Sequence, residues 1–254
     1  MKFRPIPCLL ALCAATAFTS LPAQADLPDP ATKDKVPPIA YVQGNIWRQL
    51  KLADFTLTGT VRSDKDKSKK VYPIILRTKQ HEMVYEFQDQ PLQIRVQLDP
   101  GVFTVQKRAS SSAPWADVTP DELSGTILDT DITYEDLDID FINWDDIQPL
   151  GTDNIKTLDA YVFEAKPGPT DHSRFSSVRF WVSKLYWALL RVDGINAKGQ
   201  TIKRVEVQDV MQIGKYYVFK EMKVANMLPD KDDIAASTTY IDISDGKEGS
   251  GLTN

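Results

Sequence analysis

The hydrophobic pattern of the chain changes its period early, and this change predicts one helix followed by many strands. Ile39, Val42, Ile46 and Leu50 recur every three or four residues, the spacing of an amphipathic helix. From Ala53 onward, apolar and polar residues alternate instead, as they do along a half-buried strand. The pattern predicts eleven strands, at residues 53–62, 71–78, 82–88, 92–98, 102–107, 159–166, 176–184, 185–193, 201–212, 215–226 and 236–243.

The connections between these strands are short, which predicts an antiparallel meander. Asp89-Gln90-Pro91 and Asp99-Pro100-Gly101 are turn sequences, and the charged stretch at 63–70 is typical of a solvated hairpin loop. Strands that follow one another without an intervening helix pair in antiparallel fashion. One face of each strand is apolar, so the sheet must cover that face by closing into a barrel, forming a sandwich or curling around other elements.

The middle of the chain interrupts the strands and predicts two short helices. Thr119-Pro120-Asp121-Glu122 has a capping residue, an early proline and a glutamate in the positions that begin a helix. Gly125 ends this first segment. A second begins near Thr133, with the apolar residues of 134–144 at helical spacing. Few and amphipathic, these helices are suited to cover the mouth of a curled sheet and leave an apolar cavity where the cover is incomplete.

The N-terminus has the pattern of a cleavable signal peptide. Lys2 and Arg4 precede an apolar run at 8–18, and Ala23-Gln24-Ala25 follows as a cleavage site. We expect cleavage after Ala25 and export of the remaining chain. The apolar run has about 11 residues, well below the ~20 that span a bilayer.

The alternative to a simple signal peptide is a lipoprotein signal with Cys13 as the acylated residue. Leu12 stands before this cysteine, where a lipoprotein peptidase requires a small side chain. Both cysteines, Cys8 and Cys13, lie in the segment to be removed, so the processed chain has neither a disulfide nor a cysteine-based metal site. Its net charge becomes −7, which disfavours binding to nucleic acid.

The expected domain organisation is simple. Residues 1–25 form the signal peptide, 26–38 a flexible lead-in rich in Pro, Asp and Lys, and 39–245 one domain. The Gly- and Ser-containing tail at 246–254 is expected to be disordered.

Two segments resemble a known family. One is the run from Phe180 to Asp193, which continues through Gly199 to Lys203 and Val205-Glu206-Val207; the other is Asp131–Leu137. Together they resemble the outer-membrane lipoprotein-sorting (LolA-like) proteins, in the broad branch of that family. The resemblance covers residues 40–245 and rests on diffuse patterns rather than on catalytic signatures.

The resemblance implies a fold and a function. The fold would be mainly β with a few helices: a curved antiparallel sheet of about eleven strands that forms an incomplete half-barrel, with a helical lid. The function would be that of a periplasmic carrier, a chaperone that holds lipid or lipoprotein acyl chains in a hydrophobic cavity and sorts lipoproteins to the outer membrane. Its partners would then include an inner-membrane release protein and an outer-membrane acceptor, with only transient membrane contact.

The candidate ligand-binding residues are mainly the apolar positions of the predicted strands. Arg77 is added because the sorting chaperones depend on a strand arginine near the lid, although a solvated charge is the simpler interpretation. The aromatic residues of the 181–187 region can equally pack in the core or at a sheet edge. The full candidate set is Phe55, Leu57, Arg77, Tyr85, Phe87, Ile94, Val96, Trp181 and Trp187.

Other chemistry finds little support in the sequence. His81 and His172 are the only histidines and lie in separate predicted turns, whereas zinc needs three or four such ligands. The acidic stretch 129–146 lacks the spacing of a calcium loop, and an acidic solvent face is its simpler interpretation. We therefore expect no metal and no cofactor.

Three classes of function stay open at this point. The leading one is the lipid carrier. The second is an envelope protein-interaction or sensor module that uses the same fold with a filled core. The third is an enzyme acting on a cell-wall or glycan substrate, which would need a polar cleft lined by Asp138, Asp140, Asp145 or Asp146. We expect no enzyme, because the sequence has no recognisable catalytic motif.

Overall fold

The computed structural model describes residues 33, 35–50, 52–65, 69–99, 102–229, 231 and 233–252. The predicted signal peptide and most of the predicted lead-in lie outside these residues. Within the described part, no helix combines the length and the apolar character needed to cross a membrane.

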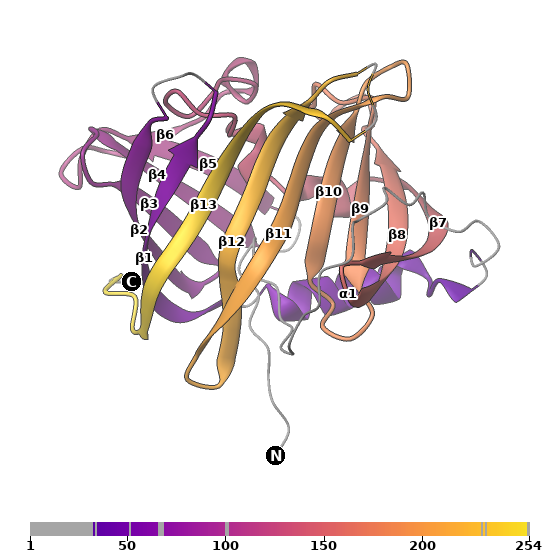
Figure 1. Cartoon of the computed structure of the whole chain (residues 1–254), viewed down its shortest axis with the longest axis horizontal. Helices are drawn as coiled ribbons and strands as arrows, with labels where there is room; N and C mark the ends of the chain where they lie inside the picture. The colour runs from indigo at the N-terminus through magenta and orange to yellow at the C-terminus, as the bar shows by residue number, and fades with distance from the viewer. Residues whose placement is uncertain are drawn as a thin grey trace.

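One antiparallel sheet dominates the fold (Figure 1). Its strands are β1 (Leu52–Ser63), β2 (Val71–Gln80), β3 (Glu82–Phe87), β4 (Leu92–Asp99), β5 (Val102–Arg108), β6 (Ala116–Asp117), β7 (Asp146–Ile155), β8 (Leu158–Lys166), β9 (Ser177–Ser183), β10 (Leu189–Ile195), β11 (Thr201–Ile213), β12 (Tyr216–Met227) and β13 (Ala235–Glu248).

The order of the strands places the first and the last strand side by side in the middle of the sheet. The order is β6-β5-β4-β3-β2-β1-β13-β12-β11-β10-β9-β8-β7. The chain therefore runs outward from the centre to β6, crosses to the far edge at β7, and returns strand by strand to pair β13 with β1. With β6 and β7 as separate edges, the sheet is a curved, open half-barrel, as the family resemblance implies.

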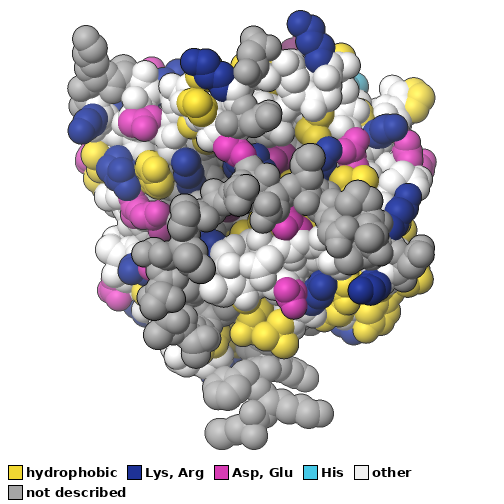
Figure 2. Space-filling model, turned by 45° about the vertical axis from the view of Figure 1, so that its right-hand side comes forward, with side chains coloured by type: hydrophobic (Ala, Val, Ile, Leu, Met, Phe, Trp, Pro, Cys, Tyr) yellow, Lys and Arg dark blue, Asp and Glu magenta, His cyan; other side chains and the backbone are white. Residues whose placement is uncertain are grey.

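The alternating pattern of the sequence places one side of each strand in the core. In β2, Tyr72, Ile74, Leu76 and Thr78 are buried, whereas the residues between them are partly exposed. The inner faces of the strands, the helix and the crossing segment between β6 and β7 contribute to a single hydrophobic core. At the surface, Figure 2 shows charged side chains of both signs spread over one face, with hydrophobic side chains gathered toward its lower right.

The one α-helix, α1 (Ile39–Gln49), lies near the ends of β8–β10 (Figure 1). Val42 and Ile46 are buried in the core, as their spacing predicts. The side chain of Gln43 donates a hydrogen bond to the carbonyl of Ile142 (2.6 Å), and the indole of Trp47 donates one to Asn143 (3.2 Å). These bonds attach the helix to the crossing segment.

The prediction of two helices in the middle of the chain is wrong, because the segment forms turns instead. The crossing segment (residues 118–145) contains only short 3₁₀ turns: η2 (Pro120–Glu122), η3 (Glu135–Leu137) and η4 (Asp140–Asn143). The predicted capping box is present at Thr119 and Glu122, but no α-helix follows it. Asp138 has an extended backbone (φ −86°, ψ 133°) and separates η3 from η4. The predicted helical lid is therefore α1 together with a cover made mostly of turns.

The sequence also missed β6 and β7 and misplaced one strand start. β6 has only two residues, too few for a pattern. In β7 the register shifts between Pro149 and Gly151, and Gly151 has φ 142°, so that its residues do not alternate regularly. β10 begins at Leu189 rather than at 185, because residues 184–188 form a turn in which Trp187 has φ 57°.

The tail from 246 was predicted to be disordered, and this is wrong for the described residues. β13 continues to Glu248 and pairs with β1 as far as Phe55. The amide of Gly249 then donates a hydrogen bond to the carbonyl of Asp54 (2.8 Å), and Lys79 donates one to the carbonyl of Leu252 (3.0 Å). Backbone pairing along a central strand outweighs the low hydrophobicity of this segment.

Candidate functional site: a cavity under the crossing segment

A cavity of about 300 Å³ lies between the inner side of the sheet and the crossing segment. Strands β5, β9, β10 and β11 form its walls, residues 118–144 of the crossing segment cover it, and the loop at 170–175 closes one side. Most of its lining is apolar: Phe103, Val105, Val118, Leu123, Ile139, Phe141, Trp144, Phe175, Val178, Leu189, Leu190, Val192, Val205 and Val207.

Four of these apolar side chains are only partly buried, although they line the cavity: Phe103, Trp144, Val192 and Val205. A preformed apolar hollow of this size lies at the lower end of the ~300–1,000 Å³ range of small-molecule sites.

Gly194 determines the position of an aromatic wall of the cavity. A Cβ atom at this residue would lie 2.3 Å from the ring of Phe175, so only glycine permits the ring to lie directly against β10. Phe175 belongs to the closing loop, and this contact therefore sets how closely the loop approaches the sheet.

A buried ion pair joins the cover to the sheet at the cavity wall. The ammonium of Lys203, on β11, lies 2.8 Å from a carboxylate oxygen of Asp136, and each side chain is only 3% exposed. Lys203 also donates hydrogen bonds to the backbone carbonyl of Asp131 and to the side chain of Asn226. All of these partners are needed to offset the cost of removing a charge from water.

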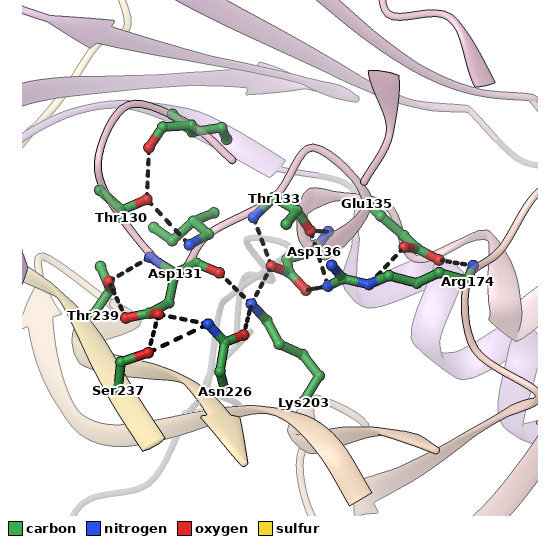
Figure 3. A network of polar contacts seen from close by, with 12 residues as sticks. Thr130, Asp131, Thr133, Glu135, Asp136, Arg174, Lys203, Asn226, Ser237 and Thr239 are labelled. Carbon is green, nitrogen blue, oxygen red and sulfur yellow. Dashed lines mark hydrogen bonds and ion pairs between the residues drawn. The ribbon is translucent and has the colours of Figure 1, made fainter. Parts of the chain in front are cut away.

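Asp131 holds the cover to β12 and β13 (Figure 3). Its carboxylate is buried and accepts hydrogen bonds from Asn226 (2.6 Å), Thr239 (3.0 Å) and Ser237. Its backbone amide donates to the hydroxyl of Thr239 (2.8 Å). A carboxylate with this many donors fixes the cover in one position relative to the strands.

Arg174 connects the closing loop to the same network (Figure 3). Its guanidinium lies 3.1 Å from Glu135 and 3.5 Å from Asp136, and its side chain is 30% exposed. The hydroxyl of Ser173 donates to Glu135 at 2.6 Å. Burial raises the pKa of the Glu135 carboxyl, although these donors partly offset the effect.

Among the acids that line the cavity, Asp138 has the pKa that differs most from its usual value. Burial, followed by the negative charges of Asp140 and Glu135, raises its pKa from the usual 3.8 to about 7. The backbone amide of Asp140 donates to its carboxylate at 2.7 Å and acts in the opposite direction. A carboxyl that changes charge near neutral pH in an apolar hollow is typical of a ligand-binding site.

The apolar candidates from the sequence are core residues rather than lining residues of this cavity. Six of them lie on the inner faces of β1, β3 and β4 and are at most 5% exposed: Phe55, Leu57, Tyr85, Phe87, Ile94 and Val96. Val96 comes closest, because it pairs with Val105 of the cavity wall. The crossing segment packs into the same core as this part of the sheet.

The remaining three candidates also lie elsewhere. Arg77 on β2 pairs with Glu86 (3.4 Å) at the surface. The indole of Trp181 donates to Asp153 (2.7 Å) on the convex face, opposite to that of Phe180. Trp187 stacks on Tyr161, with ring centroids 5.9 Å apart, in the turn before β10.

The acidic stretch 129–146 is divided among different roles. Asp129 pairs with Lys70 at the surface, Asp131 and Asp136 hold the cover, and Asp138 and Asp140 line the cavity. Within the described ranges, no three His, Cys, Asp or Glu side chains are grouped as ligands of a metal would be. His172 lies at the cavity and His81 on the other side of the sheet.

Sequence reasoning missed Lys203 as a residue of the site and named Asp138 only as a lining residue of a catalytic cleft. Lys203 had a detectable signal, because it lies in register with Val205 and Val207 on the apolar face of its strand, where a charge needs a buried partner. Asp138 was named together with Asp140, Asp145 and Asp146, and no local pattern separates the two acids that line the cavity from the two that do not.

Comparisons with known proteins agree with the fold. A family model described as "-like: Uncharacterized protein" matches residues 113–251, more than half of the chain. No curated protein matches the chain in sequence.

Solved structures of the same fold come from several bacteria. A putative outer membrane lipoprotein-sorting protein domain from Vibrio parahaemolyticus has a TM-score of 0.67 and 18% identity, covering 87% of this chain and 95% of that one. A DUF1329 family protein from Desulfovibrio piger has a TM-score of 0.64 and 17% identity, covering 86% and 96%. A LolA superfamily protein from Nitrosomonas europaea has a TM-score of 0.59 and 14% identity, covering 86% and 96%. The fold is therefore LolA-like.

Proposed function

The chain belongs to the family of uncharacterized proteins whose model matches residues 113–251. From its LolA-like fold and its apolar cavity we propose that it is a periplasmic lipid carrier. The cavity under the crossing segment holds the apolar chain of a lipid or of an acylated protein. The observation that carries the proposal is the preformed, mostly apolar hollow of about 300 Å³. One related structure is named a putative lipoprotein-sorting domain, which favours acyl chains as cargo.

The size of the cavity suits part of an acyl chain and reversible binding. A volume of about 300 Å³ accommodates on the order of ten non-hydrogen atoms, at the ~30 Å³ that each water occupies in the liquid. Burying that many methylenes gives roughly 8 kcal/mol at ~0.8 kcal/mol each. Association itself costs about 4 kcal/mol or more, so the net affinity is moderate and the cargo can leave.

The carrier works outside the cytoplasm, with the predicted signal peptide removed after Ala25. Delivery of a cargo to an acceptor requires the cover or the closing loop to move, because the apolar walls do not release a chain into water. The function is binding rather than catalysis: Asp138 and Asp140 lie close together on one segment, whereas Asp145 and Asp146 are exposed and lie outside the cavity lining.

The test is lipid mass spectrometry on the natively exported protein, purified without detergent and extracted with organic solvent. We expect a stoichiometric lipid or acylated peptide. Val192→Trp, which fills the cavity, should lose this cargo, whereas Val71→Trp at an exposed strand position should keep it. A wild-type extract that stays empty after incubation with envelope lipids would refute the carrier.

The second candidate is an envelope protein-interaction module, and one surface feature favours it. Leu185 is 70% exposed and Tyr41 is 55% exposed, and the Tyr41 ring contacts that of Trp187 (5.5 Å). An exposed apolar group of this kind is suited to a protein partner. A lipid-free protein that co-purifies with a stable partner, and loses it on Leu185→Asp, would favour this function over the carrier.

A further inference from the structure

The cavity carries an excess of negative charge that the carrier function alone does not explain. Six acidic residues line it: Asp117, Glu135, Asp136, Asp138, Asp140 and Asp171. Glu135 and Asp136 are neutralised by Arg174 and Lys203. This leaves four acids and the exposed His172 to determine the charge of the cavity.

In the described part of the chain, these four acids have hydrogen-bond donors but no cation. Asp117 accepts from the side chain of Gln106 (2.7 Å), and Asp140 from that of Asn143 (3.0 Å). Asp138 and Asp171 each accept from a backbone amide, at 2.7 and 2.6 Å. No ion pair involves any of the four within the described ranges.

The positive residues of the lining are already occupied. Lys203 is held by Asp136, Asp131 and Asn226. Arg191 lies 2.6 Å from Asp193, a buried acid that Arg204 also contacts, and its guanidinium lies over Trp181 on the convex face. Neither cation is therefore available to an anionic ligand in the hollow.

Three of the four acids without a cation lie on the cover and the closing loop rather than on the strand walls of the cavity. The strands β5, β10 and β11 contribute valine, leucine and phenylalanine, whereas Asp138 and Asp140 project from the cover and Asp171 comes from the closing loop. Carboxylates that have no cation and lie beside apolar walls repel an anion and attract a cation.

We propose that the cargo accepted here is an amphiphile with a protonated amine, whose alkyl chain lies on the strands and whose ammonium group lies between Asp138 and Asp140. The proposal rests on the carrier function and names the chemical class of its ligand. An alkylammonium has three N–H donors, and ionised carboxylates present only acceptors, so the two are complementary. A fatty acid places its carboxylate among like charges and is disfavoured.

The experiment compares decylamine, decanol and decanoic acid, which have the same chain length and different charge at pH 8. Binding to the wild-type protein is measured by isothermal titration calorimetry below the micelle concentration of each compound. We expect decylamine to bind at least tenfold more tightly than decanoate, with decanol between them.

Variants then test whether Asp138 and Asp140 cause the preference for decylamine over decanoate. In Asp138→Asn/Asp140→Asn the amine-to-decanoate ratio should fall below threefold, with the affinity for decanol kept. The matched control Asp145→Asn/Asp146→Asn removes two exposed acids of the same region outside the lining and should leave the ratio unchanged. A control that lowers the ratio as much as the cavity variant would overturn the proposal.

The wild-type comparison separates this proposal from the function it rests on. Binding of decanol and decanoate without preference for decylamine would overturn the proposed ligand class and leave the carrier intact. Failure of all three compounds to bind would overturn both.

Discussion

Asp138→Asn should remove a pH dependence from the stability of the protein. Burial and the charges of Asp140 and Glu135 raise the pKa of Asp138 from 3.8 to about 7. Between pH 3.8 and about pH 7, the folded protein therefore keeps a proton on Asp138 that the unfolded chain releases. The stabilising contribution of this group is complete below pH 3.8, and it is lost as the pH rises toward 7. Asparagine keeps the acceptor for the amide of Asp140 and does not ionise.

The size of the effect follows from the pKa shift. About three pKa units at 1.36 kcal/mol each give a difference of about 4 kcal/mol between pH 4 and pH 8. This value is a ceiling, because solvent in the cavity screens the carboxylate. Eight other ionisable groups line the same cavity: Asp117, Glu135, Asp136, Asp140, Asp171, His172, Arg191 and Lys203. Their contributions largely cancel when the variant is compared with the wild type at each pH.

Urea unfolding of both proteins at pH 4.5, 6, 7 and 8 measures the difference directly. The variant should gain stability relative to the wild type as the pH rises, and the gain should level off above pH 7. Asp145→Asn, at an exposed position of the same segment, should give a constant difference. A free-energy difference between Asp138→Asn and wild type that stays within 0.5 kcal/mol over the whole range, a spread typical of neutral surface changes, would refute the reasoning.

Three further changes test other parts of the structure. Lys203→Met leaves Asp136 without its buried partner and should cost about 3–5 kcal/mol in urea unfolding; a loss below 1 kcal/mol would contradict the role of the ion pair. Gly194→Ala forces the Phe175 ring away from β10 and should cost about 1–3 kcal/mol of stability. It should also weaken the binding of decanol in calorimetry; an unchanged affinity would show that the Phe175 ring does not contribute to binding. Phe87→Ala should cost about 3–5 kcal/mol of stability, and the folded variant should still bind decanol, because Phe87 is a core residue that does not line the cavity. Loss of binding without loss of stability would show that Phe87 takes part in binding.

Much of the sheet could be predicted because its strands each bury one face. A strand such as Leu92–Asp99 alternates strictly, and its register follows from which side is apolar. β7 was not predicted, because its register shifts between Pro149 and Gly151 and its hydrophobic residues lose their period of two. The order of the strands rests on long-range pairing, above all of β1 with β13, which no local pattern specifies.

The crossing segment shows why the cover was predicted in the wrong form. Leu137, Phe141 and Trp144 are spaced as in a helix, but Ile139 and Ile142 are also buried, so apolar contacts surround the segment. The apolar residues therefore do not form the single stripe that a helix covering the sheet would present. Local propensity begins the turns, and tertiary packing decides how they end.

The site was missed for a related reason. Its apolar lining is drawn from three strands, the cover and a loop that are far apart in the sequence, so each residue locally has the appearance of ordinary core. Only the charged residues differ from core, and their meaning depends on their partners. Asp136 is neutralised by Lys203 across the fold, whereas Asp138, two residues further on, has only a backbone donor.

The contacts that hold the cover and those that hold the closing loop differ in burial, and this difference indicates which side of the cavity opens more easily. The cover is tied to the sheet by Asp131 and by the Lys203–Asp136 pair, whose side chains are almost completely buried. The closing loop is tied to the cover by Arg174, which is 30% exposed and lies 3.1 Å from Glu135 and 3.5 Å from Asp136, and by Ser173, whose hydroxyl donates to Glu135 at 2.6 Å. Solvent screens the ion pairs of Arg174 more than the buried Lys203–Asp136 pair, so we expect parting the loop from the cover to cost less than lifting the cover from the strands. Ser173 and Phe175 move with that loop, and its displacement would expose the apolar strand wall while the charged cover keeps its place.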